Sequence, residues 1–218
     1  MGALKLKLDK KAMLLYVVTD RTWLGKNHLN EQVEETIKGG ATFIQLREKE
    51  LDYDAFVEEA LKIKEVTDKF GVPFVINDNV QVALEVDADG VHVGQSDASV
   101  GEARKLIGQD KILGVSVQTV EDALLAEKNG ADYIGVGAVF NTSTKLDANT
   151  ISFDTLKAIC RAVSIPIVAI GGISEGNVLE LKGSGVDGIA VISAIFAKPD
   201  ILEETQTLWA LSKEMVRG

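Results

Sequence analysis

One short pattern recurs along the chain. A segment with helical periodicity ends near a glycine, and a short apolar segment follows it. Four clear copies are KGGATFIQLRE (38–48), KFGVPFVIND (69–78), KNGADYIGVG (128–137) and GSGVDGIAVIS (183–193). Fainter copies lie at 87–94, 110–117 and 163–171, and LLYVVTD (14–20) supplies a first apolar segment. Glycine permits the left-handed residue that closes a helix, so we expect Gly39, Gly71, Gly130 and Gly185 at helix C-termini. The repeat predicts eight strands separated by helices.

The apolar segments are mostly continuous rather than alternating, which is typical of parallel strands that are buried on both faces. Between them, segment 53–70 places Phe56, Ala60 and Ile63 on one face of a helix. Eight such units predict an α/β protein, a (β/α)8 TIM barrel formed by residues 1–218 as a single domain. Its active site would lie at the C-terminal ends of the strands. An open doubly wound sheet is the alternative, but no G-x-G-x-x-G follows the first strand.

Composition excludes several classes of protein. The chain has a formal net charge of -10, whereas a protein that binds nucleic acid through phosphate contacts is usually basic. No apolar run is long enough to cross a membrane, and the N-terminus lacks the apolar region of a secretory signal. The single cysteine, Cys160, excludes an intrachain disulfide and fits a reducing compartment, so we expect a cytoplasmic protein. Its apolar neighbours at helical spacing favour a packing role for it.

Polar residues follow the predicted strands, where the active site of a barrel forms. The segments are Thr19–Arg21, Gln45–Lys49, Asn77–Asp78, GQSD (94–97), Ser116–Gln118, NTSTK (141–145), Gly171–Gly172 and Ile192–Ser193. Any one of them taken alone is equally well an ordinary polar loop. Together they give an acidic protein a rim that carries Arg47, Lys49 and Lys145. This set favours a site for anionic ligands.

Two features of this rim indicate phosphate and a metal ion. Gly171–Gly172, followed by a predicted helix start at Ser174, would present backbone N–H groups to an anion after the seventh strand, where this fold often binds phosphate. Asp78 and Asp97 follow neighbouring strands, and two carboxylates beside phosphate groups suggest Mg²⁺. Each carboxylate alternatively caps a turn or helix, and a general acid/base pair is a weaker third interpretation. His92 lies within a strand, where we expect it to pack.

Seven segments carry a resemblance to a known family. They are QLREK (45–49), IND (76–78), GVHVGQSD (90–97), GVS (114–116), TSTK (142–145), AIGGI (169–173) and VISAI (191–195). In this order, on predicted strand ends between about residues 14 and 196, they resemble thiamine phosphate synthase. The resemblance implies a (β/α)8 barrel that condenses a hydroxymethylpyrimidine diphosphate with a thiazole phosphate and releases pyrophosphate. It implies small-molecule substrates and Mg²⁺, and it is compatible with a homodimer.

The resemblance also implies roles for individual residues. Those expected to hold the pyrimidine diphosphate are Gln45, Arg47, Lys49 and Asn77, with Leu46 and Glu48 in the same binding segment. Ser116 would contact the pyrimidine, and Asp78 and Asp97 would bind the metal. Those expected at the thiazole phosphate are Thr142, Ser143, Thr144, Gly172, Ile192 and Ser193. Lys145 would hold the diphosphate, and we expect Lys145, Arg47 and Ser116 to act in the reaction itself.

The chain departs from the family at a few positions. The family often has a histidine two positions after the serine of GVS, where this chain has Gln118, and prolines where it has Ala138 and Asn141. A related branch, the thiazole tautomerases, uses that histidine for proton transfer, so Gln118 favours the synthase. Three alternatives remain: a tautomerase-like relative, another phosphate-binding barrel that acts on a sugar phosphate, and a non-catalytic protein that binds thiamine phosphate.

Overall fold

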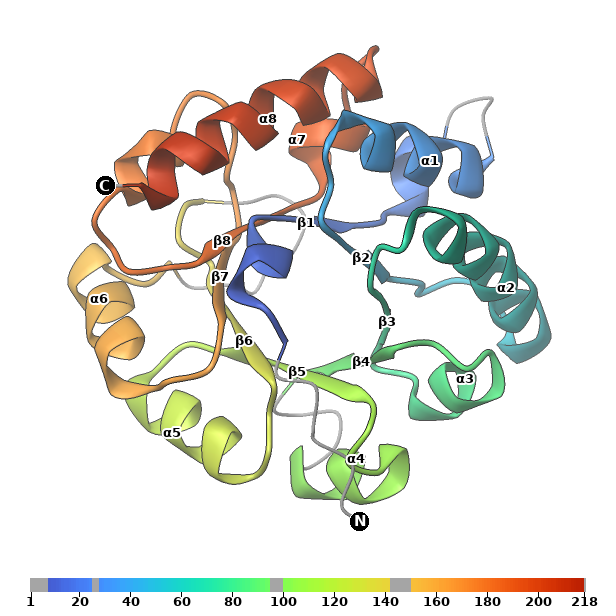
Figure 1. The fold of residues 1–218 in the computed structure, drawn as a ribbon, viewed down its shortest axis with the longest axis horizontal. Coiled ribbons are helices and arrows are strands. Elements are labelled where there is room, and N and C mark those ends of the chain that lie inside the picture. The colour runs from blue at the N-terminus through green and yellow to red at the C-terminus, as the bar shows by residue number, and fades with distance from the viewer. Residues whose placement is uncertain (1–7, 25–27, 95–99, 142–149, 218) are drawn as a thin grey trace.

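The computed structural model describes residues 8–24, 28–94, 100–141 and 150–217. Eight parallel strands close into a barrel in chain order, as Figure 1 shows. They are β1 (Leu15–Val18), β2 (Phe43–Leu46), β3 (Phe74–Asn77), β4 (Gly90–Val93), β5 (Ile112–Val117), β6 (Tyr133–Val136), β7 (Ile167–Ile170) and β8 (Gly188–Val191). Pairing of β1 with β8, through Tyr16 and Ala190, closes the barrel. The predicted fold is therefore confirmed.

Helices form a ring around the strands (Figure 1). The α-helices are α1 (Leu29–Gly39), α2 (Tyr53–Phe70), α3 (Val80–Glu85), α4 (Val100–Ile107), α5 (Val120–Lys128), α6 (Phe153–Ala162), α7 (Ser193–Phe196) and α8 (Ile201–Val216). The described residues also form three short 3-10 helices, η1 (Lys10–Met13), η2 (Arg21–Trp23) and η3 (Val178–Leu181). Within the described ranges, no helix has the length and apolar character that a membrane crossing requires. Cys160 is half-buried on α6, and burial raises the pKa of its thiol to about 11, as a packing role predicts.

The connection from β7 to β8 differs from the sequence prediction. Its residues 171–187 are all described, and they contain only the 3-10 helix η3. The helix expected to start at Ser174 is wrong, because a side chain closes a turn there instead. The Ser174 N–H donates to Asn177 Oδ1 at 2.8 Å, and Asn177 Nδ2 donates to the Gly172 carbonyl at 2.9 Å. Phosphate binding at this strand end would therefore depend on loop N–H groups and not on a helix dipole.

Gly71 and Gly130 follow helices as predicted, whereas the left-handed residue of α1 lies one position later than Gly39. The prediction for Gly185 is wrong, because the connection before β8 forms only the 3-10 helix η3, which ends four residues earlier. Gly71 caps α2 with φ of 65°, in the left-handed region. At α1 the left-handed residue is Gly40, with φ of 112°, whereas Gly39 is the last helical residue. Gly39 is needed for a different reason, because a Cβ there would lie 2.6 Å from the Thr205 Cβ on α8. The pair thus combines a helix cap with a close contact between helices.

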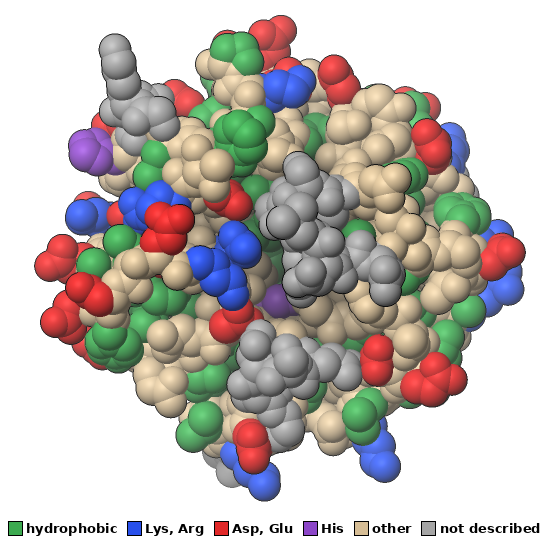
Figure 2. Space-filling model, turned by 180° about the vertical axis from the view of Figure 1, so that it is seen from behind, with side chains coloured by type: hydrophobic (Ala, Val, Ile, Leu, Met, Phe, Trp, Pro, Cys, Tyr) green, Lys and Arg blue, Asp and Glu red, His purple; other side chains and the backbone are tan. Residues whose placement is uncertain are grey.

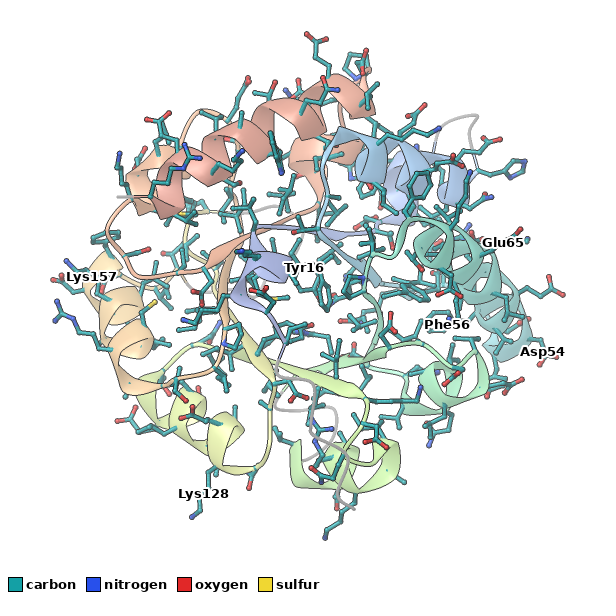
Figure 3. All side chains as sticks on the ribbon, in the orientation of Figure 1. Tyr16, Asp54, Phe56, Glu65, Lys128 and Lys157 are labelled. Atoms are coloured by element: carbon teal, nitrogen blue, oxygen red, sulfur yellow. The ribbon has the colours of Figure 1, made fainter. Side chains whose placement is uncertain are left out.

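Strand side chains divide between two cores. Residues such as Leu15, Val17 and Ile44 face outward and pack against the helices, whereas Tyr16 and Phe43 belong to a smaller cluster inside the barrel. Figure 3 shows Tyr16 pointing into the centre of the barrel, while Lys128 and Lys157 project outward from the ring of helices. Both faces of each strand are buried, which explains why the strand sequences are continuously apolar.

Candidate active site

The ends of β2 and β3 bring three of the predicted site residues together. Lys49 Nζ lies 3.1 Å from Asp78 Oδ2, and Asn77 Nδ2 donates to the same oxygen at 2.6 Å. Figure 2 shows the face at the C-terminal ends of the strands, where basic and acidic side chains lie side by side near its centre. The exposed ammonium of Lys49 is thus held at the rim by a carboxylate and remains accessible to an anionic ligand.

A sharp turn directs Asp78 over the rim. Its φ is 64°, in the left-handed region that few residues other than glycine adopt, and its N–H donates to the His92 carbonyl at 2.8 Å. Aspartate tolerates this conformation better than most residues, and such backbone strain is concentrated at functional sites. The chain therefore leaves β3 abruptly, with the Asp78 carboxylate at the mouth of the barrel.

Arg47 is anchored to the end of β1. Its Nη1 donates to Asp20 Oδ2 at 3.3 Å, and its backbone N–H donates to Thr19 Oγ1 at 3.1 Å. The side chain is half-buried, so part of the guanidinium faces solvent at the same rim as Lys49. Two cations from one segment therefore meet at the C-terminal end of β2.

The side chains of Leu46 and Glu48 do not lie at the rim where Lys49 and Asp78 meet. Leu46 follows the strand alternation outward and is fully buried against the helices. Glu48 is also buried: it accepts from Arg21 Nε at 2.8 Å and from the N–H groups of Lys49 and Glu50. Burial opposes ionisation, yet these donors lower the pKa of Glu48. Glu48 therefore shapes the loop that carries Lys49, and its place in the substrate-binding segment stays a prediction.

A row of polar side chains crosses the barrel interior below this rim. Gln45 Nε2 donates to the Tyr16 hydroxyl at 2.7 Å, and the hydroxyls of Tyr16 and Tyr133 are also 2.7 Å apart. The Tyr133 hydroxyl lies 2.9 Å from His92 Nδ1, and His92 Nε2 lies 2.9 Å from Ser116 Oγ. The row links two predicted site residues, Gln45 and Ser116, through three side chains for which the sequence predicted no functional role.

Burial keeps the groups of this row uncharged. It lowers the pKa of His92 to about 4, which the nearby Asp78 carboxylate partly opposes. Burial also raises the pKa of the Tyr16 and Tyr133 phenols. The prediction that His92 packs inside the barrel is confirmed, but its contacts are more specific than packing. One signal was available in the sequence, because a tyrosine in a buried strand needs a partner for its hydroxyl.

The predicted phosphate segment packs against the entrance to the loop that follows β6. Phe140 N–H donates to the Gly171 carbonyl at 3.0 Å, and Val139 N–H donates to the Ile170 carbonyl at 3.0 Å. Gly172 has φ of 66°, and a Cβ there would lie 2.9 Å from the Phe140 Cβ. The chain needs glycine at this position for both reasons. The base of the loop is thus fixed by backbone contacts without the prolines that are frequent in the family.

The end of β8 completes this side of the barrel. Ile192 packs against the interior cluster, and Ser193 is the first residue of α7. On the opposite side Gln118 is exposed just beyond β5. Several predicted residues lie outside the described residues, so their geometry is not part of this site: Asp97, Thr142, Ser143, Thr144 and Lys145.

The described part of the proposed metal site is a single carboxylate. Among the described residues, no group of three or more His, Cys, Asp and Glu side chains is arranged to hold a metal ion. Mg²⁺ needs only one or two protein carboxylates beside substrate phosphate oxygens. Asp78 meets that requirement, because it lies at the rim and both of its described side-chain contacts are to Oδ2. Its chemistry therefore fits a hard cation.

Comparison with known proteins agrees with the family that the motifs resemble. A family model described as thiamine monophosphate synthase matches residues 15–195. A thiamine-phosphate synthase from Clostridium beijerinckii is 53% identical over 194 residues, which cover 89% of this chain and 93% of that protein. Another from Clostridium tetani is 52% identical over 200 residues, 92% of this chain and 96% of that protein.

A solved structure extends the agreement from sequence to fold. A thiamine phosphate pyrophosphorylase from Pyrococcus furiosus superposes with a TM-score of 0.87 at 40% identity, and the match covers 95% of this chain and 98% of that one. The matched segment, residues 15–195, runs from the first residue of β1 into α7 and so includes every strand of the barrel. The chain belongs to the thiamine monophosphate synthase family.

Proposed function

We propose that this protein joins 4-amino-2-methyl-5-(diphosphooxymethyl)pyrimidine to a thiazole phosphate, giving thiamine phosphate and pyrophosphate. The observation that carries the proposal is the cluster of Lys49, Asp78 and Asn77 at the rim, in a chain of this family. The cluster places a cation and a carboxylate at one point, next to the interior row that ends at Gln45 and Ser116. Such a point suits a substrate that has a diphosphate at one end and a polar ring at the other.

The proposed reaction needs charge stabilisation more than proton transfer. The thiazole nitrogen forms a bond to the methylene carbon of the pyrimidine, and the C–O bond to the diphosphate breaks, so the diphosphate leaves with the electron pair. The nitrogen is already a nucleophile and needs no enzymic base. Negative charge grows on the departing diphosphate, where fixed positive groups lower the barrier. Arg47 and Lys49 supply such groups locally, although the protein as a whole carries a formal charge of -10.

Mg²⁺ would be held by Asp78, with Asp97 as its proposed partner. When bound, the ion would neutralise charge on the diphosphate oxygens. Asn77 holds the Asp78 carboxylate in place through its amide, and Lys49 shares the same oxygen. These two residues would therefore orient the carboxylate before any ligand arrives, while Lys49 also faces the diphosphate.

The other substrate would bind on the opposite side of the barrel. We assign the thiazole phosphate to Gly172, Ile192 and Ser193 together with the hydroxyls of Thr142, Ser143 and Thr144. The contact between Gly171 and Phe140 supports this assignment, because it brings the end of β7 next to the entrance of the hydroxyl-bearing loop. Lys145 from that loop would reach the diphosphate. This loop would then contact both anionic groups, the phosphate through its hydroxyls and the diphosphate through Lys145, with the reacting atoms between them.

Two observations weigh against the enzymatic alternatives. A thiazole tautomerase would need an acid or base at position 118, and the glutamine there does not ionise near neutral pH. Barrels that process sugar phosphates typically use a Schiff-base lysine or a carboxylate within the barrel. All eight strands are described, and they contain no Lys, Asp or Glu.

An assay with both substrates and Mg²⁺ tests the proposal. Thiamine phosphate should form only when the two substrates are present together, and omission of either should abolish the product. Incubation of the protein with the thiazole substrate alone distinguishes a tautomerase, which would isomerise it. A protein that binds thiamine phosphate but forms none from its precursors would be the non-catalytic alternative.

A further inference from the structure

The polar row inside the barrel spans its whole width. Its members come from β2, β1, β6, β4 and β5 in that order, which means that the contact between Tyr16 and Tyr133 crosses the interior. Figure 3 shows Tyr16 reaching into the centre of the barrel. Gln45 and Ser116, the two ends of the row, are the residues that we assign to the pyrimidine. The groups between them are buried, so each hydroxyl and ring nitrogen depends on its neighbours for hydrogen bonds.

The donor at one end decides the direction of every hydrogen bond in the row. Gln45 presents Nε2, which only donates, to the Tyr16 hydroxyl. Tyr16 then donates to Tyr133, Tyr133 donates to His92 Nδ1, and His92 donates from Nε2 to Ser116 Oγ. If every hydrogen bond were reversed, Tyr133 would donate to Tyr16, and the Tyr16 hydroxyl proton would point at the amide N–H of Gln45. The Tyr16 proton would then have no acceptor. A buried donor without an acceptor costs about 1–3 kcal/mol, so that direction is disfavoured.

We infer that this row holds His92 as the tautomer protonated on Nε2 and thereby makes the Ser116 hydroxyl a donor toward the pyrimidine substrate. Ser116 accepts from His92, and its own proton is therefore free to point into the site. A ring nitrogen of the aminopyrimidine is the acceptor that fits such a donor. His92 and Tyr133 are positioning residues, because they act through Ser116. The role toward the pyrimidine rests on the proposed function, whereas the tautomer of His92 does not.

The barrel leaves space for this arrangement at two glycines. A Cβ on Gly114 would lie 2.5 Å from His92 Nδ1 and would overlap the Tyr133 ring. On Gly135 a Cβ would lie 3.4 Å from His92 Cε1. The rings of His92 and Tyr133 pack with their centroids 5.5 Å apart. The two small residues therefore allow the rings to meet at one fixed position, where the hydrogen bond between them can form.

The tautomer of His92 can be measured directly. The chain has two histidines, and His28 is exposed at the start of α1, remote from the barrel interior. A His28→Gln variant labelled with ¹⁵N-histidine therefore gives a single imidazole in the NMR spectrum. We expect the neutral ring at pH 7.5 to carry its proton on Nε2. A proton on Nδ1, or rapid exchange between the two tautomers, would overturn the inference.

A double-mutant cycle tests the link to Ser116. Tyr133→Phe keeps the ring and removes the hydroxyl, so we expect KM for the pyrimidine diphosphate to rise about tenfold with little change in KM for the thiazole phosphate. In a Ser116→Ala background, Tyr133→Phe should not raise this KM further, because Tyr133 acts through the Ser116 hydroxyl and that hydroxyl is already absent. Tyr53→Phe is the matched control, since Tyr53 is 43% exposed on α2 and hydrogen-bonds only to Glu85 among the described residues.

The two measurements separate this inference from the proposed function. Additive effects of Tyr133→Phe and Ser116→Ala would overturn the positioning role. If the wild-type protein forms no thiamine phosphate, the proposed function is wrong. The NMR experiment still determines the tautomer of His92 and therefore the direction of the hydrogen bonds in the row. Thermal unfolding of each variant identifies loss of folding, and His92→Leu, which removes both ring nitrogens and so breaks the hydrogen bond to Ser116, then replaces Tyr133→Phe in the cycle.

Discussion

The Lys49 ammonium lies 3.1 Å from Asp78 Oδ2, across the ends of two neighbouring strands, and 56% of the Lys49 side chain is exposed. An ion pair this exposed contributes at most about 1 kcal/mol to stability. The barrel does not need it for folding, but a diphosphate arriving at the rim would find a cation already held in position. The effects of substitution on stability and on catalysis should therefore differ sharply.

Substitution of Lys49 separates these two effects. Lys49→Ala should lower kcat/KM for the pyrimidine diphosphate by about 10²–10³-fold, the loss expected for one preorganised charged donor, while unfolding changes little. Lys69→Ala is the control, since Lys69 has similar exposure and pairs with Glu34 at 3.0 Å on the outer helices. Steady-state kinetics and denaturant unfolding of both variants check the prediction. Equal kinetic effects in the two variants would show that Lys49 is only a surface charge.

Asp78 should control the response to Mg²⁺. Asp78→Asn keeps the shape of the side chain, and asparagine also tolerates the left-handed backbone, so the fold should remain. We expect the Mg²⁺ concentration for half-maximal activity to rise about tenfold or more, because a neutral amide is a weaker ligand for a hard cation. Asp87→Asn is a close control: Asp87 also has positive φ, of 51°, and pairs with Lys111 before β4. Identical Mg²⁺ titrations of the two variants would refute the metal assignment.

Gln118 should have no chemical role in the synthase reaction. It is exposed beyond the end of β5, and the proposed reaction needs no base at that position. Gln118→His and Gln118→Ala should both keep kcat/KM within about tenfold of the wild type, or about 1.4 kcal/mol of barrier. A loss of several orders of magnitude in Gln118→Ala would reveal a role for the amide that the proposed reaction lacks.

The burial of His92 should make stability depend on pH. Burial lowers its pKa from 6.5 to about 4, so between these values the unfolded chain binds a proton that the folded protein does not. The unfolding free energy should therefore fall as the pH drops from 6.5 to 4, by up to about 3 kcal/mol from this group alone. The His92→Gln variant has no ionisable side chain at this position, so its stability lacks this contribution to the pH dependence. The gap in stability between wild type and variant should shrink across this window, and a constant gap would contradict the prediction.

The repeat of helix, glycine and apolar strand was enough to predict the barrel, because continuous apolar strands have few other ways to be buried on both faces. Successive side chains of a strand point to opposite faces, and this alternation explains why the sequence did not separate the residues at the rim from those packed against the helices. Leu46 and Arg47 are adjacent in the sequence, yet one faces the helices and the other the rim. Which face a residue takes depends on the register of the barrel, and a continuous apolar pattern does not reveal that register.

The interior row was missed for a related reason. Tyr16 and Tyr133 are far apart in the chain and meet only across the closed barrel. Each looks like an ordinary aromatic residue of a buried strand until its hydroxyl partner is known. The turn at Ser174 resembles a helix start in the sequence because serine is a preferred residue at a helix N-terminus. There the side chain of Asn177, three residues further along, satisfies the backbone instead.

The most direct test of the account is the stoichiometry of the reaction itself. Purified protein is given both substrates with Mg²⁺, and thiamine phosphate and pyrophosphate are quantified together by ³¹P NMR. The account predicts that the two products appear in equal amounts and that Lys49→Ala slows both equally. Release of pyrophosphate or inorganic phosphate without thiamine phosphate, or no turnover at all, would contradict it.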